Sequence, residues 1–170
     1  MASIAFSAPS TREQASVLTL VLVAMALIIG SVWLFEWWGY APCQLCLEQR
    51  KPYYWAMPIV ALAIPAAFAG WPQCVARGAL AIATLALVAT ALIGAYHAGV
   101  EWGWFAAPAS CGAGISGAGS DAGSLLADLA GSVPPKCDEA AGRFLGLSFA
   151  GWNVIVASAL AVFAGRAAAR

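Results

Sequence analysis

Charged residues are scarce in this chain. Lysine, arginine, aspartate and glutamate together make up 9% of its 170 residues, whereas about a quarter of a typical soluble domain is charged. Hydrophobic residues make up 62%, so the chain lacks the polar surface that a protein surrounded by water requires. Eight basic residues balance eight acidic ones, which excludes the basic surface of a nucleic-acid-binding protein. The composition therefore indicates an integral membrane protein with no nucleic-acid partner.

Charge is missing altogether from four long segments, residues 14–35, 52–76, 78–100 and 144–165. Each exceeds the roughly 20 apolar residues that cross the hydrocarbon core of a bilayer as a helix. A fifth uncharged segment, 102–120, ends in CGAGISGAGS, and its glycine and serine cannot compensate for removing the backbone from water. We therefore predict four transmembrane helices.

These segments predict an all-α membrane protein in which four transmembrane helices form a bundle. The whole chain, 1–170, is then a single integral membrane domain. The expected spans are about 15–35, 53–71, 77–99 and 145–165, and the expected outer loops are 36–52 and 100–144. The first apolar run is longer than the roughly 7–15 residues of a signal-peptide core, so we expect it to remain as the first helix.

The distribution of charge predicts which side of the membrane is cytoplasmic. Four spans put both termini and the short turn 70–77 on one side, with four basic residues and one acidic residue. The other side has four basic and seven acidic residues. Basic residues that flank short segments favour the cytoplasmic side. We therefore expect cytoplasmic termini, with the two loops on the outer face.

Aromatic residues gather at the outer ends of the expected spans. They are Trp37, Trp38, Tyr40, Tyr53, Tyr54, Trp55, Trp102 and Trp104. Tryptophan and tyrosine anchor membrane proteins at the lipid–water interface. The outer face has more of them than anchoring requires, so we expect some to line a site for a flat, apolar ligand.

The expected topology divides the five cysteines between the two faces. It puts Cys43, Cys46, Cys111 and Cys137 outside, where disulfides form, and leaves Cys74 inside as a bystander. A bond within the Cys43-x-x-Cys46 pair gains little from loop closure, as is typical of redox-active pairs. Glycines after Cys111 and two prolines before Cys137 suit a mobile loop cysteine. Four outer cysteines allow three pairings.

Two other interpretations of these cysteines remain open. A zinc site would need all four outer thiolates, because His97 is the only histidine and belongs to a membrane run. Two purely structural disulfides would instead indicate a non-enzymatic protein with four spans. The oxidising outer compartment argues against zinc, so we expect no metal.

Two polar side chains have the spacing to assist thiol chemistry. Arg50 follows Cys46 by four residues, which puts both on one helix face if the second helix begins near Cys46. The guanidinium and the helix N-terminus would then lower the pKa of Cys46 below the ~8.5 of a free thiol. His97 precedes Glu101 by four residues at the outer end of the third span, where it could exchange a proton when electrons leave the thiols.

Taken in order, these features resemble the DsbB family, the disulfide bond formation proteins of bacterial inner membranes. The resemblance covers nearly the whole chain: four spans, Cys43-x-x-Cys46 with Arg50, His97, the outer pair Cys111 and Cys137, and CDEAAGRFLGLSFAGWN leading into the last helix. One position departs from the pattern. The family often has an acid immediately before the arginine, whereas this chain has Gln49 there, with Glu48 one position earlier. Neither residue is assigned a role.

The resemblance implies a protein-dithiol:quinone oxidoreductase. A reduced DsbA-like periplasmic thiol oxidase would attack Cys111, and Cys137 would then react towards Cys43. Cys46 would face ubiquinone or menaquinone from the membrane pool, with Arg50 and His97 as the quinone-binding residues. The implied location is the bacterial inner membrane, with both cysteine pairs periplasmic. In the family the long loop carries a short helix on the membrane surface, which matches 124-SLLADLAGS-132.

A second enzyme class shares the four-helix core and a CxxC pair. It is the vitamin K epoxide reductase type of quinone- or epoxide-linked thiol reductase, which runs in the opposite direction. Its CxxC usually lies late in the chain, at the outer end of the last bundle helix, whereas Cys43 and Cys46 follow the first span here. The order of the motifs therefore favours the oxidase.

Overall fold

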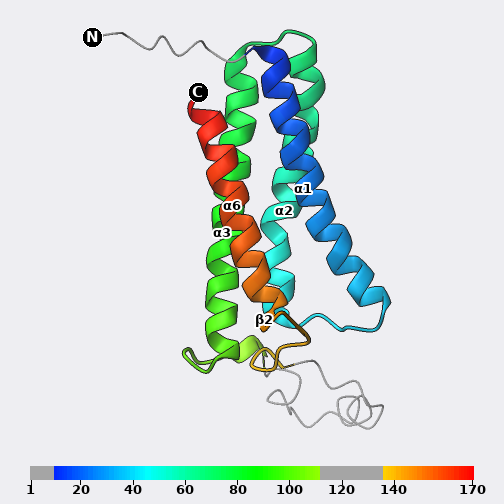
Figure 1. The fold of residues 1–170 in the computed structure, drawn as a ribbon, viewed down its shortest axis with the longest axis vertical. Coiled ribbons are helices and arrows are strands. Elements are labelled where there is room, and N and C mark those ends of the chain that lie inside the picture. The colour runs from blue at the N-terminus through cyan, green and yellow to red at the C-terminus, as the bar shows by residue number, and fades with distance from the viewer. Residues whose placement is uncertain (1–9, 112–135) are drawn as a thin grey trace, which may run out of the picture.

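The fold was analysed in a computed structural model, which describes residues 10–111 and 136–170. Four long helices run side by side over those residues (Figure 1). They are α1 (Thr11–Trp37), α2 (Gln44–Phe68), α3 (Gln73–Glu101) and α6 (Phe149–Ala169). Successive helices run in opposite directions, so the start of α1 and the end of α6 lie at the same end of the bundle (Figure 1).

Short elements close the opposite end of the bundle. A single 3-10 turn, η1 (Ala109–Cys111), follows α3. An antiparallel hairpin of β1 (Arg143–Phe144) and β2 (Leu147–Ser148) precedes α6, with Arg143 paired to Ser148. Leu145 and Gly146 at its tip both have positive φ, which makes the tight two-residue turn possible.

Three of the helices in the described residues are long and apolar enough to cross a membrane, namely Arg12–Trp37, Gln73–Glu101 and Phe149–Ala169. The chain is therefore a helical membrane protein, as predicted. The remaining expected span, 53–71, lies largely in α2, which contains Pro52, Pro58 and Pro65 and has charged residues in its second turn. That this helix also crosses the bilayer remains a prediction.

Side-chain caps fix where the helices begin. Ser10 and Glu13 form a reciprocal capping box at the start of α1, and the Ser148 hydroxyl accepts the Gly151 amide at the start of α6. The start of α2 is capped by a sulfur, since Cys43 Sγ accepts the Cys46 amide. Helix α2 therefore starts at Gln44, and residues 44–52 of the predicted outer loop 36–52 are helical.

Small residues allow the helices to pack closely. Alanines make up much of the buried core, together with Leu18, Val21, Leu80 and Leu87. Between α3 and α6, a Cβ atom added at Gly94 would lie 3.0 Å from Val154 and 3.4 Å from the Ala150 carbonyl. Close contact through small residues is the usual basis of helix association in lipid. At the inner end, Arg77 Nε donates to the carbonyl of Ala168 at 2.9 Å and joins α3 to α6.

Candidate redox site

The CxxC pair lies at the N-terminus of α2. Cys43 is the N-cap residue, and its Sγ accepts the Cys46 amide at 3.3 Å. The Sγ atoms of Cys43 and Cys46 lie 2.9 Å apart and share a hydrogen bond. Cys43 is buried and Cys46 is half-buried. The helix begins at Gln44, two residues earlier than a start at Cys46, so the positive end of α2 acts on Cys43 first.

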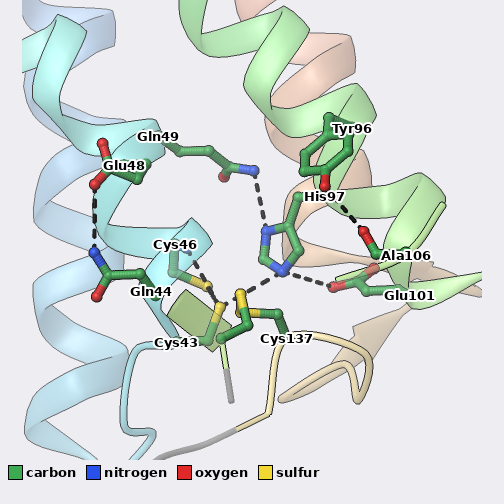
Figure 2. Close-up of a disulfide and its surroundings, with 11 residues drawn as sticks. Cys43, Gln44, Cys46, Glu48, Gln49, Tyr96, His97, Glu101, Ala106 and Cys137 are labelled. Atoms are coloured by element: carbon green, nitrogen blue, oxygen red, sulfur yellow. Dashed lines mark hydrogen bonds and ion pairs between the residues drawn. A yellow bond between two sulfur atoms is a disulfide. The ribbon is translucent and has the colours of Figure 1, made fainter. Parts of the chain in front are cut away.

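The C-terminal end of α3 brings His97 against this pair (Figure 2). His97 is 2% exposed, and its Nε2 lies 3.5 Å from Cys43 Sγ. Its Nδ1 lies 3.2 Å from the side-chain nitrogen of Gln49. Glu101, one turn further along α3, has Oε1 3.7 Å from His97 Nε2. The structure thus joins a histidine and a cysteine that are 54 residues apart in the sequence.

Gln49 determines which nitrogen of His97 carries the proton. The Gln49 amide nitrogen can only donate, so Nδ1 of the imidazole accepts and Nε2 carries the hydrogen. The Nε2–H group then donates to the sulfur of Cys43. The sequence did not predict this role for Gln49. The only feature noted there was that Gln49 replaces the acidic residue that the family often has at this position.

The second cysteine pair packs directly on the first. Cys111 and Cys137 are joined by a disulfide. Of the three possible pairings, this one leaves Cys43 and Cys46 as a pair of their own. Cys137 is 1% exposed and belongs to one apolar cluster with Cys43, Leu45 and Val100. Figure 2 shows Cys137 beside Cys43 below the His97 ring. The Gly-rich stretch after Cys111 and the predicted helix 124–132 lie outside the described residues.

The thiolate of the reduced pair belongs to Cys43. A hydrogen bond from Cys46, with a further hydrogen bond from His97, lowers the pKa of Cys43 to about 4 despite its burial. The hydrogen bond with Cys43 and burial raise the pKa of Cys46, and the charge of Arg50 lowers it by less. The predicted lowered pKa of Cys46 is therefore wrong for this state, because the N-cap sulfur takes the negative charge.

Arg50 is held by a residue that the sequence analysis did not single out. Its guanidinium Nη1 lies 2.5 Å from Oε1 of Glu36, near the end of α1. The Arg50 side chain is 9% exposed and that of Glu36 is 30% exposed. Glu48, the acid next to Gln49, is instead paired at the surface with Lys51. A buried guanidinium needs such a partner, so Glu36 fixes where the cation lies.

A cavity of about 220 Å³ opens beside Cys46 and Arg50. Its walls come from α1, α2 and α6 and are mostly apolar. Aromatic residues line it as expected, but Tyr40 and Tyr53 are the only ones of the predicted set, and Phe35, Phe149 and Trp152 complete it. The more exposed rings, such as Trp37 and Trp55, point outward as interfacial anchors do.

A second cavity, of about 190 Å³, adjoins the first and shares Cys46 and Phe149 with it. Cys43, Cys46, His97 and Glu101 line it, together with residues just after Cys137. The Glu101 side chain is 4% exposed, and its Oε2 has no hydrogen-bond partner among the described residues. Cys46 lines both cavities and Cys43 lines only the second. Cys46 therefore borders both a mostly apolar cavity and a more polar one.

The same cluster has the donor atoms of a metal site. Ligand atoms of Cys43, Cys46 and His97 lie within 4.8 Å of one another. The four-cysteine zinc site considered from the sequence is excluded in this state, since Cys111 and Cys137 are bonded to each other.

Comparison with known proteins identifies the family. The family model "Disulfide bond formation protein DsbB" matches residues 13–167. No curated protein and no solved structure matches the chain. Because the match covers almost the whole chain, the chain belongs to the DsbB family, whose members are membrane thiol oxidoreductases that form disulfides.

Proposed function

We propose that this member of the DsbB family oxidises a DsbA-like periplasmic dithiol protein and passes the electrons to a membrane quinone. In this proposal α2 also crosses the membrane and brings the number of spans to four. The termini are cytoplasmic, and both cysteine pairs face the periplasm of a bacterial inner membrane. The four catalytic residues are Cys43, Cys46, Cys111 and Cys137.

One observation carries the proposal: Cys46 lies between the apolar cavity and the rest of the sulfur cluster. On one side it borders the apolar cavity, which also has Arg50 in its lining. On the other side it touches Cys43, which packs on Cys137. A route for electrons from an outer thiol to an apolar acceptor needs this order of groups.

The apolar cavity has properties that fit a quinone ring. Its volume of about 220 Å³ and its aromatic lining suit a flat, apolar group. Arg50 lies at its edge and can donate a hydrogen bond to a carbonyl oxygen. A quinone bound there would supply an acceptor for two electrons and two protons. His97 lines the polar cavity instead, so we assign it to Cys43, and of the two predicted quinone-binding residues we propose Arg50 for contact with the quinone.

The sulfur chemistry follows from the order of the pairs. A partner thiolate attacks Cys111, and the Cys111–Cys137 bond breaks to release the Cys137 thiolate. Cys137 attacks Cys43 of the oxidised pair, which releases Cys46 as a thiolate. The second partner thiolate then releases Cys111 and takes the partner to its disulfide. Cys111 re-forms its bond with Cys137, and Cys43 leaves as a thiolate beside Cys46. Two electrons are now stored on Cys43 and Cys46, and they leave when that disulfide re-forms.

His97 stabilises the leaving sulfur in this sequence. Its Nε2–H group donates to Cys43 each time Cys43 becomes a thiolate, which lowers the barrier to breaking a bond at that sulfur. Glu101 borders the polar cavity with a free oxygen and can accept the proton released when a thiol becomes a thiolate.

The test uses purified protein, a reduced DsbA-type protein and a soluble quinone. We expect the absorbance of the quinone to fall at the rate at which the partner becomes oxidised. Cys46→Ser should abolish this turnover, because Cys43 then has no disulfide for Cys137 to attack. The variant should stop after its Cys111–Cys137 bond has oxidised one partner, and peptide mass mapping should then find Cys111 and Cys137 reduced. Cys74→Ser is the matched control, because Cys74 is exposed at the start of α3 and far along the chain from the cluster. Full activity of Cys46→Ser would refute the proposal.

A further inference from the structure

The inner part of the apolar cavity contains a polar network that the sulfur chemistry does not use. Tyr53 Oη donates to Asn153 Oδ1 at 2.9 Å, and Asn153 Nδ2 donates to Thr90 Oγ1 at 3.1 Å. The Thr90 hydroxyl in turn donates to the carbonyl of Gln49 at 2.7 Å. Tyr53 and Asn153 line the cavity, whereas Thr90 does not. Polar side chains in a membrane interior are costly and usually have a function.

The hydrogen-bonding capacity of this network is not exhausted. The Tyr53 oxygen donates one hydrogen bond and still has lone pairs to accept another. Tyr53 is 2% exposed, so water from outside the protein does not supply that partner. A hydroxyl can also rotate and donate instead. Tyr53 can therefore bind either a carbonyl oxygen or a hydroxyl at the wall of the cavity.

The spacing of α2 relates this group to Arg50. Tyr53 follows Arg50 by three residues, so the two lie on neighbouring positions of one helix face and differ by about 4.5 Å along its axis. Arg50 and Tyr53 both line the same cavity, with apolar wall around them.

We propose that Tyr53, oriented by Asn153, binds the second oxygen of a para-quinone whose first oxygen faces Arg50. The inference rests on the proposed function, since it names the residues that recognise the far end of the same ligand. A hydroxyl suits this position because it donates to the carbonyl of the oxidised ring and accepts from the hydroxyl of the reduced ring. Asn153 is a positioning residue, and Thr90 holds Asn153 without reaching the ligand.

The test measures binding, not turnover. Two ring ligands are compared on the oxidised protein through quenching of tryptophan fluorescence, since Trp152 lines the cavity. One is a substituted hydroquinone, and the other is the same ring without one hydroxyl. Wild-type protein should bind the hydroquinone about fivefold more tightly, as one net hydrogen bond allows. In Tyr53→Phe the two ligands should bind equally.

Two control variants separate recognition from stability. Tyr54→Phe removes a hydroxyl from an exposed ring that does not line the cavity and should keep the fivefold preference. Leu80→Ala removes a fully buried side chain that does not line the cavity, and it should lower the unfolding temperature while it also keeps the preference. Equal binding of the two ligands by wild type overturns the inference without any variant. A full preference in Tyr53→Phe overturns it as well. If wild type reduces quinone in either case, the proposed function stands.

Discussion

Arg50 of α2 and Glu36 of α1 form an ion pair at the edge of the apolar cavity, with 2.5 Å between Nη1 and Oε1. This ion pair links two helices that both line the cavity, and a Trp33–Tyr54 hydrogen bond also joins them. A charged pair so close in a poorly solvated setting holds the guanidinium in one orientation. Two helices thus decide together where the proposed quinone-binding cation lies.

Glu36→Gln should raise the apparent KM for quinone by about tenfold, equivalent to about 1.4 kcal/mol, since Arg50 loses the partner that orients it. Steady-state quinone reduction measures this. Arg50→Ala should raise KM at least as much, and adding Glu36→Gln to it should change nothing further. Glu48→Gln is the control, because Glu48 pairs with Lys51 at the surface. Additive effects of Glu36→Gln and Arg50→Ala would show that Glu36 does not act through Arg50.

The reduced protein should be alkylated at Cys43 and not at Cys46. Because the pKa of Cys43 is lowered to about 4, its thiolate persists as the pH falls from neutral and is lost only near about pH 4, whereas a free thiol loses it below about pH 8.5. The rate of iodoacetamide labelling, followed by peptide mass mapping, should be nearly flat across that interval. Cys46→Ala should shift the decline in rate to higher pH, since it removes the Cys46 hydrogen bond, which is the largest cause of the lowered pKa, and His97→Ala should shift it less. A decline near the free-thiol value in the wild type would contradict this assignment.

Gln49→Glu should change which nitrogen of His97 carries a proton. The wild-type Gln49 amide donates to Nδ1, so nitrogen NMR should find Nδ1 unprotonated and Nε2 protonated at neutral pH. A carboxylate at position 49 can only accept, so Nδ1 should become protonated. The measurement is direct because the chain has one histidine, provided that the purification tag has none. Gln44→Glu, on the exposed face, should leave the spectrum unchanged.

Gly94→Ala should lower the unfolding free energy by about 1–3 kcal/mol, the range for overpacking a tight core. Its added Cβ would meet the Val154 side chain at 3.0 Å and the Ala150 carbonyl at 3.4 Å, where α3 and α6 are in contact. Gly78→Ala is the matched control within α3, since nothing lies within 4 Å of its added Cβ. It should be neutral or stabilising because alanine favours helix. Thermal unfolding in detergent compares the two, and equal stability would contradict the packing argument.

Local patterns were enough to predict part of this site. The uncharged runs predicted a membrane protein of long helices, and three of them meet the length and composition for crossing a bilayer. The spacing of Cys43, Cys46 and Arg50 predicted their common position at the start of α2, because residues four apart share a helix face. The same reasoning put His97 near Glu101, where the distance is 3.7 Å.

The sequence by itself determined that two cysteine pairs belong to a bundle of apolar helices, since these properties depend on composition and short spacings. Only the tertiary structure decided which helix faces meet. It brought His97 to Cys43, Gln49 to His97, Glu36 to Arg50 and Tyr53 to Asn153. These partners lie on different helices, and helical periodicity says nothing about the rotation of one helix against another. It also put the thiolate on Cys43, because the exact start of α2 makes that sulfur the N-cap.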